Sequence, residues 1–255
     1  MTQQPSSPFS PPASIPQMEV IDEVPESAMV VFAHPDDAEI GAGATAALWA
    51  QAGCEITYVQ CTSGSSGSND RTMTSDKIVQ IRAAEQKAAA DTIGVKHSVV
   101  LNHPDGGLEA DRIFLGELVR AIRQYRPHTV FCHDPYRMNG FQHRDHRHVG
   151  ITTMDAIYPY ARDHLHFPEQ VEKEGLEPHK VRQLLMWGAD EPNAIVDVSE
   201  SVDRQIDALS KHESQIPGLD RGSEIDVRIR DRHKLVAEGF PFKYGEGFRR
   251  LLARV

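Results

Sequence analysis

Long apolar runs, an even set of cysteines and an excess of positive charge are all missing from this sequence. No stretch approaches the roughly 18 apolar residues of a membrane span. The first twenty residues are rich in proline and serine and lack the basic start and apolar run of a signal peptide. The three cysteines lie in apolar surroundings and cannot all pair, which argues against a disulfide framework. We therefore expect a cytoplasmic protein without a membrane span.

The shortage of basic residues limits the class of partner. Lysine and arginine total 27 against 37 aspartate and glutamate residues, which gives a net charge of −10. Phosphate backbones and anionic lipids attract basic surfaces, so a nucleic acid is not an expected partner. We expect a small-molecule substrate instead. The oligomeric state stays open, with a homo-oligomer as one alternative.

Length and composition fit one folded unit. The chain has 255 residues, of which 40% are hydrophobic and 25% charged, enough for a single α/β domain with a sizeable core. Residues 1–24 are polar and proline-rich, and we expect them to form a flexible tail. Residues 25–255 are then the single domain.

Short apolar runs typical of strands alternate with helical patterns along the chain. The predicted strands are 28–33, 55–61, 97–101, 129–132, 182–187 and 194–198. The predicted helices are 39–51, 75–93, 113–125 and 201–212, with a second charged helix after residue 226. This alternation predicts an α/β fold, a Rossmann-like three-layer sandwich with a mostly parallel sheet and helices on both faces. Ligands bind such sheets at the carboxyl ends of the strands.

The first motif that carries chemistry is Ala-His-Pro-Asp-Asp-Ala-Glu at residues 33–39, where the first strand ends and a helix begins. An aspartate at a helix start often caps free backbone amides, but capping explains neither the histidine nor the second aspartate. His34 and Asp37 have the spacing of metal ligands on a tight turn, which leaves Asp36 free to act on a reacting water. Catalytic zinc takes three protein ligands and keeps one position open.

The second motif is His-Arg-Asp-His-Arg-His-Val-Gly at residues 143–150, in the loop after the fourth predicted strand. A histidine cluster on a loop is also compatible with a charged surface. Both motifs are predicted at the same edge of the sheet, so His146 can complete the zinc set. His143, one helical turn earlier, then faces the substrate.

Together these motifs resemble the PIG-L or LmbE-like family of metal-dependent deacetylases, whose hallmarks are an AHPDD segment after the first strand and an HxDH segment downstream. The resemblance runs from about residue 29 to at least residue 212. It implies a zinc-dependent hydrolase that removes the N-acetyl group of an N-acetylglucosamine-containing compound.

The resemblance also implies roles for individual residues. His34, Asp37 and His146 bind the metal, Zn²⁺ or alternatively Fe²⁺. Asp36 is the general base that activates a metal-bound water, and His143 stabilises the oxyanion or protonates the leaving amine. Asp145 orients His143, although an aspartate here could simply cap the following helix.

Two further positions are predicted to bind substrate. The resemblance places Arg82 near the sugar hydroxyls, whereas its spacing from Glu85 also fits a surface ion pair. Asp105 lies in a His-Pro-Asp-Gly-Gly turn at residues 103–107, and related proteins have a similar segment lining the pocket. Arg144 stands where proline is common in the family, and it either favours an acidic substrate or faces solvent.

Two alternatives remain open from the sequence. One is an amidase that removes a larger acyl group with the same metal set, as thiol-conjugate amidases do. The other is a nonenzymatic Rossmann-like binding module. Such a module is expected to have Gly-x-Gly-x-x-Gly after the first strand, and residues 41–43 supply only Gly-Ala-Gly inside a predicted helix.

Overall fold

The computed structural model describes residues 18–253. Residues 1–17 of the predicted tail therefore lie outside the described part of the chain. The rest of that predicted tail includes strand β1 (Glu19–Val20), which pairs in parallel with a strand near residue 195. Ordered structure thus begins before residue 25, because the backbone groups of Glu19 and Val20 complete the edge of a sheet.

The α/β fold is confirmed, with one eight-stranded sheet in the order β1-β7-β8-β6-β5-β2-β3-β4. The remaining strands are β2 (Ser27–Phe32), β3 (Glu55–Thr62), β4 (His97–His103), β5 (Thr129–His133), β6 (Gln183–Trp187), β7 (Ala194–Asp197) and β8 (Gly245–Leu252). All pairs are parallel except those of β8, which runs antiparallel to β6 and β7. The sequence did not predict β1 or β8.

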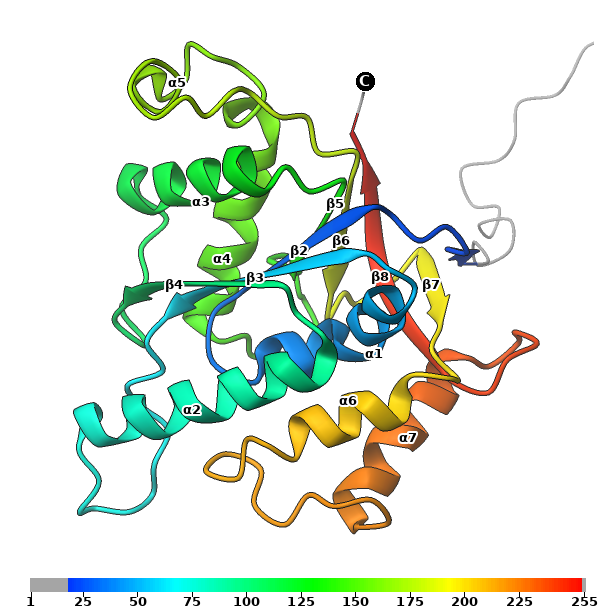
Figure 1. Cartoon of the computed structure of the whole chain (residues 1–255). Coiled ribbons are helices and arrows are strands. Elements are labelled where there is room, and N and C mark those ends of the chain that lie inside the picture. Colours follow the sequence, from blue (N-terminus) through cyan, green and yellow to red (C-terminus); the bar gives the residue numbers. More distant parts are fainter. Residues whose placement is uncertain (1–17, 254–255) are drawn as a thin grey trace, which may run out of the picture.

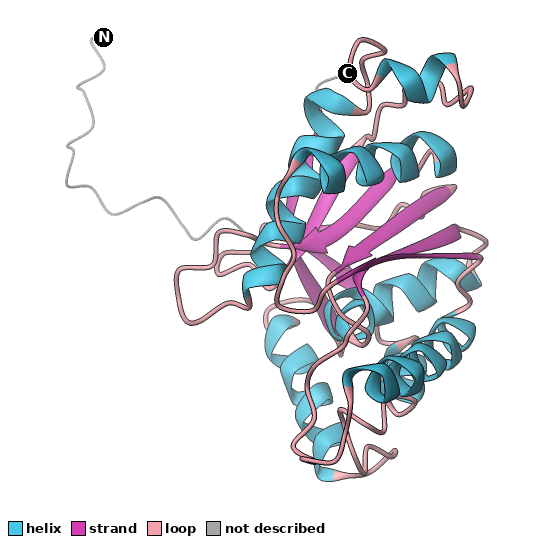
Figure 2. Cartoon of the chain, turned by 90° about the vertical axis from the view of Figure 1, so that its left-hand side faces the viewer, coloured by secondary structure: helices cyan, strands magenta, loops and turns pink. Residues whose placement is uncertain are grey.

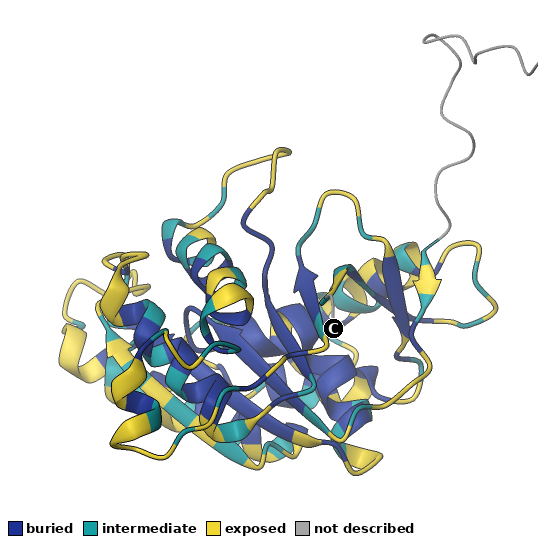
Figure 3. Cartoon of the chain, turned by 90° about the horizontal axis from the view of Figure 1, so that it is seen from above, coloured by how far each residue is buried: buried dark blue, intermediate teal, exposed yellow. Residues whose placement is uncertain are grey.

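Helices cover both faces of the sheet (Figures 1 and 2). One face carries α1 (Asp37–Gln51), α2 (Ser75–Ile93), α6 (Val202–Leu209) and α7 (Glu224–Val236). The other carries α3 (Arg112–Tyr125), α4 (Arg144–Asp155), the π-helical turn η1 (Ala156–Tyr160) and α5 (Pro168–Glu172). The central strands between these layers are buried (Figure 3). None of the described helices is long and apolar enough to cross a membrane.

Local signals explain where the predicted helices begin and end. The Thr74 side chain accepts a hydrogen bond from the Lys77 amide at the start of α2, and Gly94 ends that helix with φ 95°. Asp111 caps α3 in the same way through the Ile113 and Phe114 amides. A side-chain oxygen at the N-cap satisfies amides that have no partner within the helix.

Helix α1 departs from regular geometry near its start. Ala42 has non-helical angles (φ −146°, ψ 17°), so the amides of Ala44 and Thr45 are free to donate to the Glu246 carboxylate from β8. A Cβ atom at Gly41 would lie 2.4 Å from the Trp187 ring at the end of β6. Glycine at this position lets the helix approach the sheet closely.

The order of the strands also fixes where a site can form. The chain moves from β2 to β3 and β4 on one side, and β5 and β6 lie on the other side of β2. The carboxyl ends of β2 and β5 therefore flank the point where the direction of chain progression reverses, the usual ligand crevice of such sheets. Both sequence motifs follow these two strands.

Candidate metal centre and active site

A tight turn after β2 brings His34 and Asp37 together. The Asp37 Oδ2 atom accepts a hydrogen bond from the His34 backbone amide at 2.8 Å, and it also lies 3.2 Å from His34 Nδ1. The carboxylate therefore folds back onto the turn, and it contacts the turn and the imidazoles of His133 and His146 rather than the amides of α1. Capping is not its role here.

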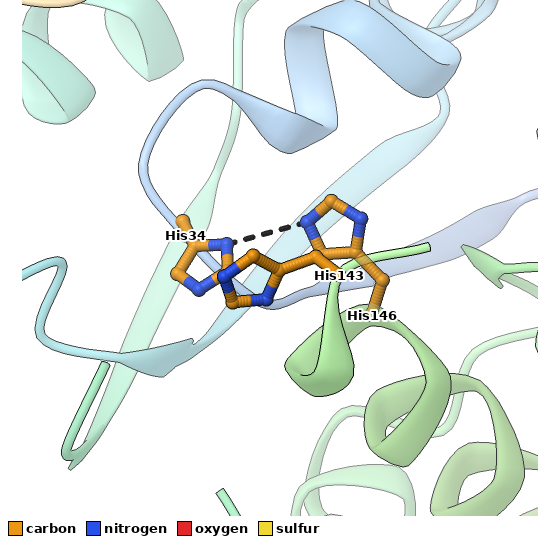
Figure 4. Close-up of side chains that lie close together, drawn as sticks. All are labelled: His34, His143 and His146. Atoms are coloured by element: carbon orange, nitrogen blue, oxygen red, sulfur yellow. Dashed lines mark hydrogen bonds between the residues drawn. The ribbon is translucent and has the colours of Figure 1, made fainter. Parts of the chain in front are cut away.

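The second motif forms the start of α4. His143 is the N-cap residue, and its Nδ1 atom accepts a hydrogen bond from the Asp145 amide at 3.2 Å. His146 follows one helical turn later. Figure 4 shows the imidazoles of His34, His143 and His146 gathered from the segment after β2 and the start of α4. The ring of His143 is exposed and meets the His34 ring edge-on, with centroids 4.5 Å apart.

The three predicted metal ligands present converging donor atoms. His146 Nε2 lies 3.2 Å from Asp37 Oδ1 and 3.3 Å from His34 Nδ1. Ligand atoms about 2.0–2.1 Å from a tetrahedral zinc ion lie roughly 3.3 Å from one another. Two imidazoles and one carboxylate also form a donor set that suits Zn²⁺ or Fe²⁺. The residues present therefore fit the metal that the resemblance implies.

Two carboxylates contact the second ring nitrogen of His34, Nε2. His34 Nε2 lies 3.1 Å from Asp145 Oδ2 and 3.2 Å from Asp105 Oδ1. Burial alone would lower the pKa of His34, but the hydrogen bonds to Asp105, Asp145 and Asp37 outweigh it and raise that pKa to about 11. The carboxylates around His34 thus attract positive charge. A carboxylate on the second nitrogen is also the usual way to orient a metal-binding imidazole.

Asp145 contacts two of these histidines. Its backbone amide donates to His143 Nδ1, and its fully buried carboxylate contacts His34 and accepts hydrogen bonds from the amides of Gly106 at 2.7 Å and Leu108 at 3.3 Å. The first turn of α4 points this carboxylate inward, toward the loop after β4. Asp145 therefore links that loop to His34.

His133, which the sequence motifs do not include, also lies at the centre. Its ring stacks on His146 with centroids 3.9 Å apart, and its Nε2 atom lies 3.4 Å from Asp37 Oδ2. Burial lowers the pKa of His133 to about 4, which favours the neutral imidazole. Its position at the last residue of β5, beside the first motif across the sheet, was the available signal.

Among residues 18–253, three groups of histidine and acidic side chains bring one donor atom each within 4.8 Å of one another. They are His34, His143 and His146; His34, Asp105, His143 and Asp145; and Asp37, His133 and His146. The predicted ligands take their members from the first and third groups. His34 has second-nitrogen carboxylate partners, whereas His133 packs on His146, so His34 fits a ligand better and His133 a supporting ring.

Asp36 stands beside this cluster with an unusual backbone. It is the N-cap of α1 with φ 99° and ψ −28°, and its side chain makes no capping hydrogen bond. Burial, followed by the charge of Asp37, raises the pKa of Asp36 to about 7. A carboxylate with a pKa near neutrality can both accept and return a proton under physiological conditions.

Arg82 and Asp105 also lie at the centre. Arg82 is only 4% exposed, and its guanidinium donates to the backbone oxygens of Pro35 at 2.8 Å and Ser66 at 3.0 Å. It lies 3.5 Å from Asp36 Oδ2 and 3.8 Å from Asp105 Oδ2. This arginine is therefore not the partner of Glu85 in a surface ion pair.

The role of Arg144 was left open by the sequence, and in the structure its side chain contacts other residues of the protein. It donates to the Leu108 backbone oxygen at 2.6 Å and pairs with Glu109 at 2.5 Å. Its charge is therefore matched by a neighbouring carboxylate on the loop after β4. The structure gives no reason to assign it to an acidic substrate.

An apolar cavity lies elsewhere in the protein. Its volume is about 420 Å³, and Met154, Tyr158, Leu184 and Leu251 are among its lining residues. Leu184 is near the start of β6, so this cavity opens at the amino ends of the parallel strands, opposite the histidines. None of the histidines and carboxylates of the candidate centre lines it.

Comparison with known proteins agrees with this geometry. Residues 29–157 match the family described as PIG-L, GlcNAc-PI de-N-acetylase. The diacetylchitobiose deacetylase of Thermococcus kodakarensis is 31% identical over 184 residues, which cover 72% of this chain and 68% of that protein. The 1D-myo-inositol 2-acetamido-2-deoxy-alpha-D-glucopyranoside deacetylase of Segniliparus rotundus is 33% identical over 57% of this chain and 56% of its own length.

A solved structure supports the same relationship. The N,N'-diacetylchitobiose deacetylase from Pyrococcus horikoshii superposes with a TM-score of 0.82 at 27% sequence identity, over 89% of this chain and 84% of that one. The alternative of a nonenzymatic binding module finds no support in these matches.

Proposed function

The chain belongs to the PIG-L family of metal-dependent deacetylases, and on that premise we propose that it removes the N-acetyl group from a small molecule containing N-acetylglucosamine. The observation that carries the proposal is the convergence of three donor groups. His34 Nδ1 and His146 Nε2 lie 3.3 Å apart, each is 3.2 Å from one oxygen of Asp37, and the carboxyl of Asp36, whose pKa is raised, lies next to them.

His34, Asp37 and His146 would hold the metal, with Zn²⁺ favoured by the donor set and Fe²⁺ as the alternative. When bound, the ion supplies Lewis acidity, which polarises the amide carbonyl and makes water a better nucleophile near neutral pH. His133 and Asp145 keep the two imidazoles in the required orientation through the ring stack and the contact at His34 Nε2.

Asp36 is the proton carrier of the proposed reaction. Its carboxylate accepts a proton from the attacking water and then returns it to the leaving nitrogen, so one group serves both steps. Arg82, 3.5 Å from Asp36 Oδ2, favours the ionised form and thereby limits the rise in the pKa of Asp36. Positioned proton transfer of this kind contributes on the order of 10²–10⁴ in rate.

His143 stabilises the oxyanion in this proposal. Its Nδ1 atom accepts the Asp145 amide, so in the neutral ring the hydrogen is on Nε2. That N–H is then free to donate to the oxygen of the tetrahedral intermediate. Loss of a comparable donor costs other hydrolases roughly 3–4 kcal/mol of transition-state stabilisation. The geometry favours this role over that of a general acid.

The substrate class rests on the relatives. Those named above act on diacetylchitobiose and on an inositol-linked 2-acetamido sugar, which share an acetylated glucosamine unit. Asp105 and Arg82 lie within the cluster, beside His34 and Asp36 respectively, and we assign them to contacts with the sugar hydroxyls.

The test is release of free amine by the zinc-loaded protein from N-acetylglucosamine, diacetylchitobiose and an inositol-linked N-acetylglucosamine, each compared with its N-butyryl analogue. We expect turnover of at least one acetyl compound. Preference for the butyryl series would instead favour the amidase alternative.

A matched pair of variants tests the mechanism. Asp36→Asn should keep the bound metal and lose roughly 10²–10⁴ in kcat. Asp91→Asn, a change of the same type on the surface of α2, should behave like the parent protein. Full activity in the Asp36 variant would overturn the assignment of the base.

A further inference from the structure

Three buried polar side chains outside the predicted site form a chain that ends on Asp36. Gln86 Oε1 accepts a hydrogen bond from the Asp36 backbone amide at 3.0 Å. The Gln86 side-chain amide donates in turn to Glu39 Oε1 at 3.0 Å, and His212 Nε2 lies 3.3 Å from Glu39 Oε2. None of these three residues has a role in the reaction described so far.

The backbone of Asp36 requires support from its surroundings. Its φ of 99° lies in a region that residues with a side chain adopt rarely. Such conformations persist only where neighbouring groups hold them. The bond from the Asp36 amide to Gln86 is one such restraint, and the Pro35 carbonyl, held by Arg82 at 2.8 Å, is another.

Glu39 determines which end of the Gln86 amide faces Asp36. A glutamine side chain offers an oxygen that accepts and a nitrogen that donates. Because the Glu39 carboxylate only accepts, it draws the nitrogen of Gln86 toward itself and leaves the oxygen for the Asp36 amide. If the terminal amide of Gln86 were rotated by half a turn, its NH₂ group would face the Asp36 backbone N–H, and two donors would meet.

The burial of these three hydrogen-bonded side chains distinguishes them from an ordinary surface network. Glu39 and His212 are 0% exposed, and Gln86 is 7% exposed. Burying a carboxylate costs free energy that an apolar residue of similar size would not require. Glu39 lies on α1, three residues after Asp36. Its contacts with Gln86 and His212 therefore connect the start of α1 to α2 and to the segment after α6.

We propose that Gln86, oriented by Glu39, is a positioning residue that holds the Asp36 carboxyl in its reactive place. This inference rests on the proposed function of Asp36 as proton carrier. A change of about 1 Å in the position of a reacting group can cost roughly 10²-fold in rate. These hydrogen-bonded side chains would therefore affect turnover without contacting substrate or metal.

The principal test is Gln86→Met, which preserves side-chain length but removes both hydrogen bonds. We expect a fall in kcat of about 10- to 100-fold, with KM and zinc content close to those of the parent protein. The matched control is Gln170→Met, which removes a buried glutamine that also makes two hydrogen bonds, at the far end of the α3 layer. It should lower thermal stability and leave kcat unchanged.

A second pair keeps the inference testable if Gln86→Met folds poorly. Glu39→Met removes the group that orients Gln86, whereas Glu39→Gln can still accept from it. We expect Glu39→Gln to recover most of the kcat that Glu39→Met loses. Equal losses in the two variants, or parent-like kcat in a folded Gln86→Met protein, would overturn the positioning role.

The double variant separates this inference from the proposed function. If Gln86 acts through Asp36, Gln86→Met should cause no further loss of kcat in the Asp36→Asn background. An additive loss would exclude action through Asp36. If Asp36→Asn alone is fully active, the proposed function fails first, and that result is distinguishable from failure of the positioning role.

Discussion

The stacked rings of His133 and His146 present two histidines at one carboxylate, and a substitution can distinguish their roles. Phenylalanine at position 133 would preserve the stack but remove the nitrogen 3.4 Å from Asp37 Oδ2. We expect His133→Phe to retain one metal ion per chain with affinity reduced about 10- to 100-fold, as is typical when a supporting contact is lost.

The same substitution at the proposed ligand is the control. His146→Phe removes a donor atom from the convergent set, so we expect it to lose the metal altogether. Metal content after dialysis against a weak chelator, measured by elemental analysis, compares the two proteins. Loss of metal from His133→Phe with retention by His146→Phe would assign the ligands the other way.

On the face of the sheet that carries α3, one arginine of that helix binds the long connection between α4 and α5. Arg123 is 1% exposed, and its guanidinium donates to the Gln170 side chain and to five backbone carbonyls. These carbonyls belong to Tyr160, Ala161, Asp163, His166 and Phe167. The α4–α5 connection is therefore organised by a buried cation.

Arg123→Lys should be strongly destabilising, because an ammonium group cannot reach so many acceptors in the plane of a guanidinium. We expect a loss of about 3 kcal/mol in the free energy of unfolding, measured by urea denaturation. Arg120→Lys in the same helix provides the control. Arg120 pairs with Glu174 on the surface, where an ion pair contributes less than about 1 kcal/mol. Equal effects at the two positions would contradict the role of Arg123.

The folded protein as a whole should depend on the metal for part of its stability. The carboxylates of Asp37, Asp105 and Asp145 surround His34 and draw positive charge into the centre. A ligand that binds only the folded chain stabilises it by about 4 kcal/mol at a concentration 1,000 times its dissociation constant. We therefore expect a chelator to lower Tm, by about 2–4 °C for each kcal/mol lost.

Calorimetry of the zinc-loaded protein with and without chelator measures this shift. The His146→Phe protein should show the same Tm in both conditions, because it has no metal to lose. A Tm that is insensitive to chelator in the parent protein would show that metal binding contributes little to folding. Activity lost at the same time would still locate the metal in the reaction.

Much of the fold was predictable because local patterns determine it. The predicted bounds of α2 are those observed, since a side-chain cap at Thr74 and a glycine at position 94 mark both ends in the sequence itself. Strand β8 was missed because its apolar residues show no clear run. Its place between β6 and β7 depends on pairing with strands far away in the chain.

The sequence alone determined the family, the α/β fold and the residue types of the site, because the two motifs bring their chemistry in short segments after two strands that are neighbours in the sheet. Only the tertiary structure decided how those residues meet. Asp145 turned out to contact His34, 111 residues away, and Glu39 meets His212 across 173 residues. Local spacing determines neighbours one helical turn apart, whereas contacts between distant segments depend on how helices pack on the sheet. The contacts of Gln86 with Asp36 and Glu39, which join α2 to the start of α1, are of this second kind.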